Sequence, residues 1–228
     1  AHGVMRREKQ EGFESKVVCF HCNYGQKTEE RELASFKKLC EHFGIEESDQ
    51  FVIDIGFLKQ IGKSSLTDES VDIAQDGHAI ENKYVPTSYV PFRNGNLLSI
   101  AGSIAAAYEA TDIWCGVVQE DSSGYPDCRV EFIANFEVAL NCGLPDGVDV
   151  VLHAPLVGMR KEQIINAGTE LGVPYEHTWS CYKNNDKACG LCDSCRLRVA
   201  SFARLESVDP IEYQDGWDKA LENAQVAI

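Results

Sequence analysis

Four cysteines near the end of the sequence have a spacing that suits a metal ion. Cys181, Cys189, Cys192 and Cys195 follow the pattern C-x7-C-x2-C-x2-C. Thiolates separated by two residues can hold one ion from a tight turn, and the longer arm returns the remaining ligand to close a tetrahedron. A closed shell of this kind, with no position left open for a substrate, is typical of structural zinc sites. We therefore predict that these cysteines bind a structural Zn²⁺.

An iron–sulfur cluster is the main alternative for the same cysteines. The pattern C-x2-C-x2-C also opens the run that binds clusters in bacterial ferredoxins, but that run continues with C-x3-C-P. Here Cys195 is followed by Arg-Leu-Arg-Val-Ala-Ser, which favours zinc. Thiols without any ligand are a weaker alternative, because the cysteines cluster so tightly. The cysteines of the apolar stretches are predicted to be small buried hydrophobic residues: Cys19, Cys22, Cys40, Cys115 and Cys142.

The segment Asn82–Ala101 leads into a helical pattern with an arginine at its start. Pro86 and Pro91 bias the segment towards extended backbone, and Arg93 and Asn94 then precede the apolar helix. A helix N-terminus attracts anions, and an arginine beside it adds a bidentate charged group. We predict an anion site here. The competing interpretation is that Asn94 caps the helix and that Arg93 is solvated.

Two polar turns that follow predicted strands are candidates for binding. In the later turn, Glu120 and Asp121 precede a Ser-Ser-Gly step and then Asp127 and Cys128. Carboxylates at such a place can hold Mg²⁺ on a nucleotide, and the dipole of the following helix would favour a nucleophilic Cys128 thiolate. Turn and capping roles are nevertheless the favoured interpretation of Asp127 and Cys128. The earlier Asn-Tyr-Gly turn could contact a nucleobase, but ordinary turn chemistry is the commoner outcome.

Strand-like and helical runs alternate along the chain, and this alternation predicts the fold class. Strands are predicted over 16–22, 50–55, 112–118 and 148–156, and helices over 29–44, 96–110, 131–143 and 160–172. Such alternation is typical of an α/β fold with a doubly wound parallel sheet, in which ligands bind beyond the carboxyl ends of the strands. The polar stretch 62–84 has no clear period and is predicted to be an excursion or a flexible loop. We predict a nucleotide-binding α/β domain over 1–175 and a zinc-binding segment over 176–228 packed on it.

The composition favours a protein that acts on small molecules. Of the 228 residues, 44% are hydrophobic, which is enough for a sizeable core. The excess of 36 acidic over 21 basic residues gives a net charge of −15, which disfavours duplex nucleic acid and anionic lipid as partners. The sequence contains no apolar run of membrane-spanning length and does not open on a secretory signal, so we expect a reducing, cytoplasmic setting and no membrane partner.

Six motifs, in the same order along nearly the whole chain, resemble the 7-cyano-7-deazaguanine synthases of the queuosine pathway, the QueC family of the PP-loop superfamily. The motifs are YGQ (Tyr24–Gln26), YVPxRN (Tyr89–Asn94), SGYPDCR (Ser123–Arg129), TWSCY (Thr178–Tyr182), CGxCDSCxLR (Cys189–Arg198) and DPxxY (Asp209–Tyr213). The cysteine motif is highly specific, and the others gain weight from their order.

The resemblance implies a Rossmann-like, adenine nucleotide α-hydrolase-like fold, a structural zinc, and ATP with Mg²⁺ as co-substrate. The implied reaction converts 7-carboxy-7-deazaguanine and ammonia to the nitrile through an adenylated carboxylate, in a homodimeric enzyme. The resemblance implies catalytic roles for Arg93, Asp121 and Asp127. It implies substrate or cofactor binding by Tyr24, Gly25, Gln26, Tyr89, Arg93, Asn94, Ser123, Gly124, Tyr125 and Arg129.

The sequence also departs from the family pattern. The family's nucleotide loop, S-G-G-x-D-S, is missing, and we expect the physical protein to have a first strand and a phosphate loop ahead of Ala1. Asn23 stands where the family has an acidic residue, Gly95 lies in an altered helix start, and Val130 replaces a proline. Two further hypotheses stay open: a related adenylating enzyme that attaches a deazaguanine to a protein or nucleic acid, and a deazaguanine-binding module without catalysis.

Overall fold

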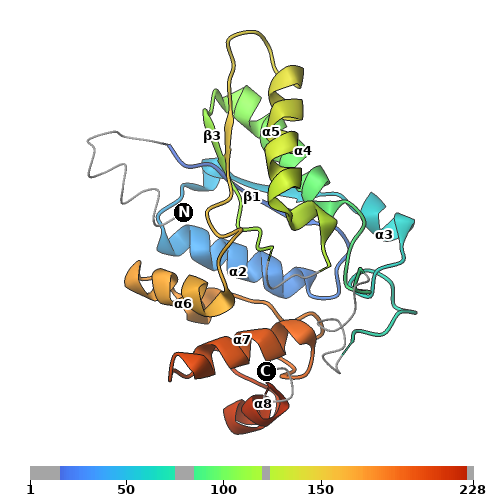
Figure 1. Ribbon diagram of the computed structural model, residues 1–228, viewed down its shortest axis with the longest axis vertical. Helices are drawn as coiled ribbons and strands as arrows, with labels where there is room; N and C mark the ends of the chain where they lie inside the picture. Colours follow the sequence, from blue (N-terminus) through green and yellow to red (C-terminus); the bar gives the residue numbers. More distant parts are fainter. Residues whose placement is uncertain (1–15, 75–84, 120–123, 225–228) are drawn as a thin grey trace.

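The computed structural model describes residues 16–74, 85–119 and 124–224, which form an α/β structure. The helices are α2 (Glu29–His42), α3 (Phe57–Ile61), α4 (Arg93–Tyr108), α5 (Val130–Gly143), α6 (Lys161–Glu170), α7 (Asp193–Arg204) and α8 (Gly216–Ala224). The strands are β1 (Cys19–Asn23), β2 (Gln50–Asp54), β3 (Asp112–Trp114) and β4 (Val151–His153). Figure 1 shows α4 and α5 side by side in one lobe, and α7 and α8 at the opposite end of the molecule.

The strands form two parallel pairs. β1 pairs with β2 in a register that sets Cys19 opposite Gln50, and β3 pairs with β4 in a register that sets Ile113 opposite Leu152. A helix follows the first strand of each pair, α2 after β1 and α5 after β3. Both pairs are therefore β-α-β units, as the alternation of strands and helices predicts.

Within the described residues the two pairs do not join into one sheet. A groove of about 930 Å³ lies between them and is lined by residues 17–20, by residues 110–114 and by apolar side chains of α2 and α4. β1 and β3 both line this groove, and each has a single strand partner among the described residues. The α/β class with parallel strands is confirmed, whereas one continuous doubly wound sheet stays a prediction.

α2 forms where the sequence predicts a helix, because its apolar residues repeat at helical spacing. Three glutamates in its first turn lie at the positive end of the helix dipole. The helix ends just before Gly44, whose φ of +65° is the left-handed conformation that favours glycine after a helix. Phe36 of α2 stacks on His21 of β1 with 5.5 Å between the ring centroids, which fixes the helix on the strand.

Small residues in α4 let α5 approach it closely. A Cβ atom at Gly102 would lie 2.3 Å from Leu140 Cδ1, so a larger residue there would force this leucine to shift. Leu98 and Ala105 of the same helix are buried with Ile113 of β3 in one apolar cluster. This packing holds α4 in place and therefore fixes the position of its first turn.

The C-terminal residues build an apolar core of their own around the cysteines. The buried members of this core all lie between Cys181 and Ala224. Tyr182 also packs against the apolar cluster beside β1, and Asn185 Nδ2 donates to the Lys27 carbonyl at 3.1 Å. The cysteine segment is therefore packed on the α/β part of the chain.

The structure shortens two of the predicted strands. The predictions over 112–118 and 148–156 reduce to the three-residue strands β3 and β4. Gly116 and Pro155 explain the early C-terminal ends of these strands, because glycine weakens a strand and proline cannot donate to the ladder. The described part of the predicted excursion, 62–74, contains no helix or strand, in agreement with the sequence.

The prediction that the five cysteines of the apolar stretches are buried is confirmed for two of them. Cys22 and Cys40 are buried, and Cys19 and Cys115 are half-buried. Cys142 is exposed, so the prediction that it is buried is wrong. Cys142 lies in the last turn of α5 between Leu140 and Leu144, which pack against the apolar cluster, so the cysteine falls on the other side of the helix.

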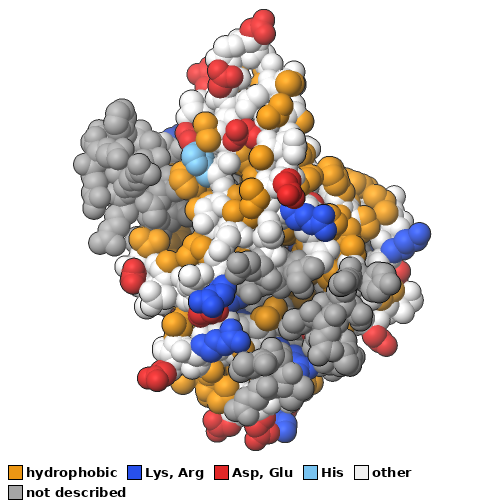
Figure 2. Space-filling view, in the orientation of Figure 1, with side chains coloured by type: hydrophobic (Ala, Val, Ile, Leu, Met, Phe, Trp, Pro, Cys, Tyr) orange, Lys and Arg blue, Asp and Glu red, His pale blue; other side chains and the backbone are white. Residues whose placement is uncertain are grey.

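Acidic side chains lie at both ends of the long axis of the molecule, whereas several Lys and Arg side chains lie around the middle of the face in Figure 2. None of the helices in the described residues is long and apolar enough to cross a membrane.

Candidate functional site

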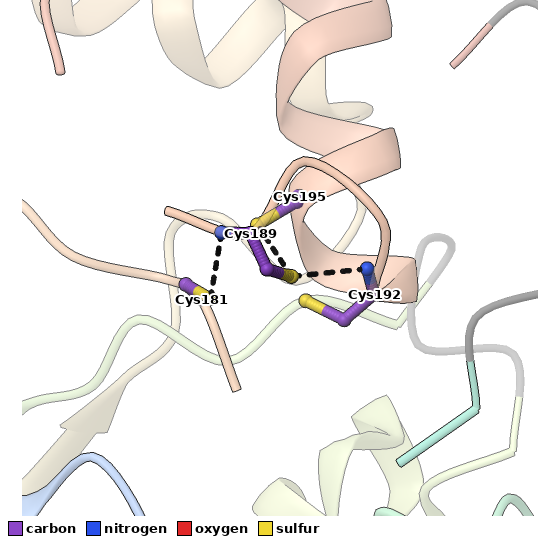
Figure 3. Close-up of side chains that lie close together, drawn as sticks. All are labelled: Cys181, Cys189, Cys192 and Cys195. Carbon is purple, nitrogen blue, oxygen red and sulfur yellow. Dashed lines mark hydrogen bonds between the residues drawn. The ribbon is translucent and has the colours of Figure 1, made fainter. Parts of the chain in front are cut away.

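The four cysteines that the sequence predicts as metal ligands lie together and are buried. Their Sγ atoms all lie within 4.8 Å of one another, and Figure 3 shows the sulfurs turned toward a common centre. Zinc–thiolate bonds of about 2.3 Å in a tetrahedron require sulfurs roughly 3.8 Å apart. Cys189 Sγ lies 3.9 Å from Cys195 Sγ. The donor set therefore fits one tetrahedral metal ion with four thiolate ligands.

Local backbone geometry brings these cysteines round a common centre. Cys192 is the N-cap residue of α7, and Cys195 lies in the first turn of that helix. Gly190 has a φ of +69°, the left-handed conformation that glycine adopts easily in a tight turn. The backbone N–H of Cys189 donates to Cys181 Sγ at 3.4 Å, and that of Cys192 donates to Cys189 Sγ at 3.3 Å. Such donors stabilise thiolates, the form of cysteine that binds metals.

A buried ion pair connects α7, which follows the cysteines, to the residues before and after the cysteine segment. Arg198 donates from Nε and Nη2 to the two carboxylate oxygens of Asp209, at 2.5 and 2.8 Å. The Tyr213 hydroxyl donates to Asp209 Oδ2 at 2.6 Å, and Arg198 Nη1 donates to the Thr178 hydroxyl at 2.7 Å. Burial raises the pKa of Tyr213, so its hydroxyl keeps its proton. This network joins the TWSCY, CGxCDSCxLR and DPxxY motifs.

The YGQ turn closes on itself beyond the carboxyl end of β1. The Tyr24 N–H donates to Gln26 Oε1 at 2.9 Å, and Gln26 Nε2 donates to Glu32 Oε2 at 3.1 Å. Glu32 Oε1 also accepts from the Thr28 hydroxyl at 2.6 Å. Gln26 therefore orders the turn and holds the Glu32 carboxylate of α2 beside it.

Gly25 has a backbone conformation that only glycine adopts easily. Its φ is +76°, and an added Cβ would lie 2.7 Å from Lys59 Cδ. We expect Gly25→Ala to lower the free energy of unfolding by about 1–2 kcal/mol, measured by urea denaturation. Gly158→Ala is the matched control, because a Cβ there meets nothing within 4 Å. Equal unfolding free energies for the two variants would contradict this expectation.

Arg93 opens α4 and contacts the YGQ turn. Its Nη1 donates to the Tyr24 hydroxyl at 2.9 Å, and its guanidinium carbon lies 5.4 Å from the centre of the Tyr24 ring. The interaction with Tyr24 raises the pKa of Arg93, so the guanidinium stays charged. Burial raises the pKa of Tyr24, which keeps the phenol neutral. Arg93 is therefore held against the turn and is half-buried instead of fully solvated.

The SGYPDCR loop caps the first turn of α4. Asp127 is buried, and its Oδ2 accepts the backbone N–H of Asn94 at 2.9 Å. Asn94 Nδ2 donates to Cys128 Sγ at 3.1 Å. These are the turn and capping contacts that the sequence favours for Asp127 and Cys128. Asn94 itself is not the N-cap residue, because α4 starts one residue earlier, after Phe92.

Tyr89 and Tyr125 lie beside the same helix start. Their ring centroids are 5.8 Å apart, and the Tyr125 hydroxyl lies 2.6 Å from Ser88 Oγ. The Tyr89 hydroxyl accepts the Phe92 backbone N–H at 2.9 Å. Both tyrosines therefore support the turn that presents Arg93.

The remaining predicted site residues lie apart from this group or cannot be placed. Arg129 is exposed, at the N-cap of α5. Gly124 is half-buried in the loop before Tyr125. Asp121 and Ser123 lie outside the described residues.

A cavity of about 190 Å³ lies where these elements meet. It is lined by Tyr24, Gln26, Lys27, Thr28, Glu32, Leu66, Arg93, Trp179, Ser180, Tyr182 and Ser194. The structure thus brings together three of the predicted binding residues, Tyr24, Gln26 and Arg93, with residues of the cysteine segment. A cavity lined by two half-buried cations, Lys27 and Arg93, by a carboxylate and by several aromatic side chains suits a small, planar, anionic ligand.

A comparison with protein families decides where this chain belongs. The family model described as "Queuosine biosynthesis protein QueC" matches residues 4–206. The chain belongs to the QueC family. The match covers the YGQ turn, the start of α4 and the four cysteines, so the elements that line the cavity are all parts of the QueC domain.

Individual relatives agree with this assignment. A protein of Sulfurimonas denitrificans named 7-cyano-7-deazaguanine synthase is 48% identical over 205 residues, which are 90% of this chain and 88% of the relative. Proteins with the same name from Nautilia profundicola and Methanosphaerula palustris are 45% and 47% identical over 206 and 200 residues. These alignments cover 90% and 87% of this chain, and 90% and 88% of the respective relatives.

Some lining residues of this QueC domain are missing from the sequence-based prediction. Trp179 and Ser180 belong to the TWSCY motif, and this motif was the signal that could have found them. Glu32 carries no such signal, because only the tertiary contact with Gln26 brings its carboxylate to the cavity.

Proposed function

We propose that this chain catalyses the ATP-dependent conversion of 7-carboxy-7-deazaguanine and ammonia to 7-cyano-7-deazaguanine. The observation that carries the proposal is the QueC match over residues 4–206, together with relatives named for this synthase that align with most of the chain. The cavity supports it, because the Arg93 guanidinium suits a carboxylate substrate.

The chemistry explains why ATP is needed. A carboxylate does not react with ammonia directly, because oxide is a poor leaving group. Transfer of AMP from ATP to the carboxylate releases pyrophosphate, and ammonia then displaces AMP to give an amide. A second adenylation, on the amide oxygen, lets that oxygen leave with AMP while the nitrogen loses its protons, which forms the nitrile. The protein's contribution is to position the reactants and to stabilise the developing negative charge.

The described residues support specific roles in this proposal. Arg93 would face the carboxylate or a phosphate, Tyr24 and Gln26 would order the cavity wall, and Asp127 would hold the start of α4. A direct catalytic role of Asp127 and an Mg²⁺-binding role of Asp121 stay predictions. The cysteine cluster would hold Zn²⁺ as a folding element, because four thiolates leave no open coordination position. We also propose that the enzyme is a homodimer and that a boundary near residue 175 separates the nucleotide-binding domain from the zinc-binding segment.

One incubation tests the function. We expect purified protein with ATP, Mg²⁺, ammonium and 7-carboxy-7-deazaguanine to form free 7-cyano-7-deazaguanine and AMP, detected by chromatography and mass spectrometry. Omission of ammonium should abolish the nitrile. Transfer of deazaguanine to a protein or nucleic acid without free nitrile would replace the proposal by the macromolecule-modifying alternative. Binding of the deazaguanine without AMP release would replace it by the binding module.

A further inference from the structure

Glu32 brings a carboxylate to the cavity, and the proposed function gives this group no role. The residue lies in the first turn of α2 and lines the cavity together with Gln26 and Thr28. Gln26 and Thr28 are only 5% and 3% exposed, whereas Glu32 is half-buried. Of these three side chains, Glu32 therefore keeps the most surface that a ligand can reach.

Two hydrogen bonds hold the Glu32 carboxylate in one position. Gln26 Nε2 donates to Oε2 at 3.1 Å, and the Thr28 hydroxyl donates to Oε1 at 2.6 Å. An ionised carboxylate has about four acceptor sites on its two oxygens, so each oxygen can accept a further hydrogen bond. The carboxylate is therefore preorganised, and a ligand that donates to both oxygens loses little binding energy to side-chain ordering.

The charges that line the cavity have no counter-ion within the described part of the chain. Among those residues, no ion pair involves Glu32, Arg93 or Lys27. Arg93 donates to the Tyr24 hydroxyl, and Lys27 Nζ donates to the Val71 carbonyl at 3.3 Å, so both cations have neutral partners. Half-buried charges of this kind are stabilised by a ligand that brings hydrogen-bonding groups of complementary polarity.

A ligand that satisfies both kinds of charge has an anion at one end and adjacent N–H donors at the other. The 7-carboxy-7-deazaguanine of the proposed reaction has this distribution. Its carboxylate lies on the five-membered ring, whereas its N1–H and 2-amino groups lie side by side on the far edge of the six-membered ring. Two parallel N–H donors match the two oxygens of a carboxylate and form a bidentate pair of hydrogen bonds.

We propose that Glu32 recognises the deazaguanine ring by accepting hydrogen bonds from its N1–H and 2-amino groups, while Arg93 binds the carboxylate at the other end. The inference rests on the proposed function and deepens it by naming a residue that determines specificity. A hypoxanthine-type ring lacks the 2-amino group and leaves one Glu32 oxygen without its donor. Glu32 therefore selects guanine-type rings over hypoxanthine-type rings.

Calorimetric titration with two ligands tests the proposal. One ligand is 7-carboxy-7-deazaguanine, and the other is 7-carboxy-7-deazahypoxanthine, which lacks only the 2-amino group. We expect Glu32→Gln to weaken binding of the first ligand about 30-fold and of the second about threefold, because the amino group is a partner of the removed charge. Glu30→Gln is the matched control, since Glu30 lies in the same helical turn but is exposed and does not line the cavity. This variant should bind both ligands like the unchanged protein.

Three results would overturn the inference and leave the proposed function intact. The first is an equal loss of affinity for both ligands in Glu32→Gln, which is the result that a purely structural role predicts. The second is equal affinity of the unchanged protein for the two ligands. The third is unchanged ligand affinity in Glu32→Gln with a raised KM for ammonium, which would assign the carboxylate to ammonia. Failure of the unchanged protein to bind either ligand would overturn the proposed function and the inference with it.

A second variant covers the case in which Glu32→Gln does not fold. Glu32→Asp keeps the negative charge but withdraws it from the cavity by one methylene group. We expect it also to weaken binding of 7-carboxy-7-deazaguanine more than binding of the hypoxanthine-type ligand. Equal losses for the two ligands would again overturn the inference.

Discussion

Replacement of Cys192 by serine is expected to abolish metal binding and to unfold the C-terminal segment. Cys192 is fully buried, and its sulfur is one of the four that surround the site. A serine hydroxyl does not replace a thiolate as a zinc ligand. Binding of structural zinc provides about 10–16 kcal/mol in zinc-finger peptides, a value as large as the whole stability of many domains, about 5–15 kcal/mol. The apolar core around the cysteines would lose the ion at its centre.

Metal analysis and thermal unfolding measure this effect together. We expect the unchanged protein to carry zinc and Cys192→Ser to carry none, with a fall in Tm of more than about 10 °C. Cys142→Ser is the matched control, because Cys142 is exposed and lies outside the cluster. It should keep both the metal and the Tm. A Cys192→Ser variant with zinc and an unchanged Tm would refute the prediction, and iron in the unchanged protein would establish the cluster alternative.

The buried ion pair between Arg198 and Asp209 is expected to give the second large effect. The Asp209 side chain is 0% exposed and that of Arg198 is 9% exposed. Asp209→Asn keeps the size of the side chain but leaves the guanidinium buried without a counter-charge. Breaking a buried pair in this way costs about 3–5 kcal/mol. The variant should also disturb the cavity wall, because Arg198 holds Thr178 at the start of the TWSCY motif.

Urea denaturation of two variants isolates the effect of burial. Glu222→Gln removes the same charge from an ion pair with Lys219, at 2.8 Å, but the Glu222 side chain is 65% exposed. An exposed pair is screened by water, so this control should unfold like the unchanged protein. Similar unfolding midpoints for Asp209→Asn and Glu222→Gln would show that the buried ion pair of Arg198 stabilises the protein no more than an exposed pair does.

The sequence by itself determined the cluster of four cysteines that could hold a metal ion and the pieces of the α/β fold. The four cysteines lie within one short segment, so their spacing and the glycine at position 190 largely specify how they meet. Helices such as α2 and α5 follow from apolar periodicity, which depends only on neighbouring residues. The prediction of an anion site at Arg93 also followed from its place at the start of a helix, because the dipole and the helix end are local features.

Only the tertiary structure decided what these pieces build together. Arg93 meets Tyr24 across 69 positions of the chain, and Trp179 meets Arg31 across an even longer separation. No local pattern specifies such pairs, because they depend on how α4 and the cysteine segment pack on β1. The same reason explains why Asn94 and Asp127 prove to be partners in a helix cap. The cavity wall at Trp179 and Ser180 therefore emerges from long-range packing, while the cysteine cluster follows largely from local spacing.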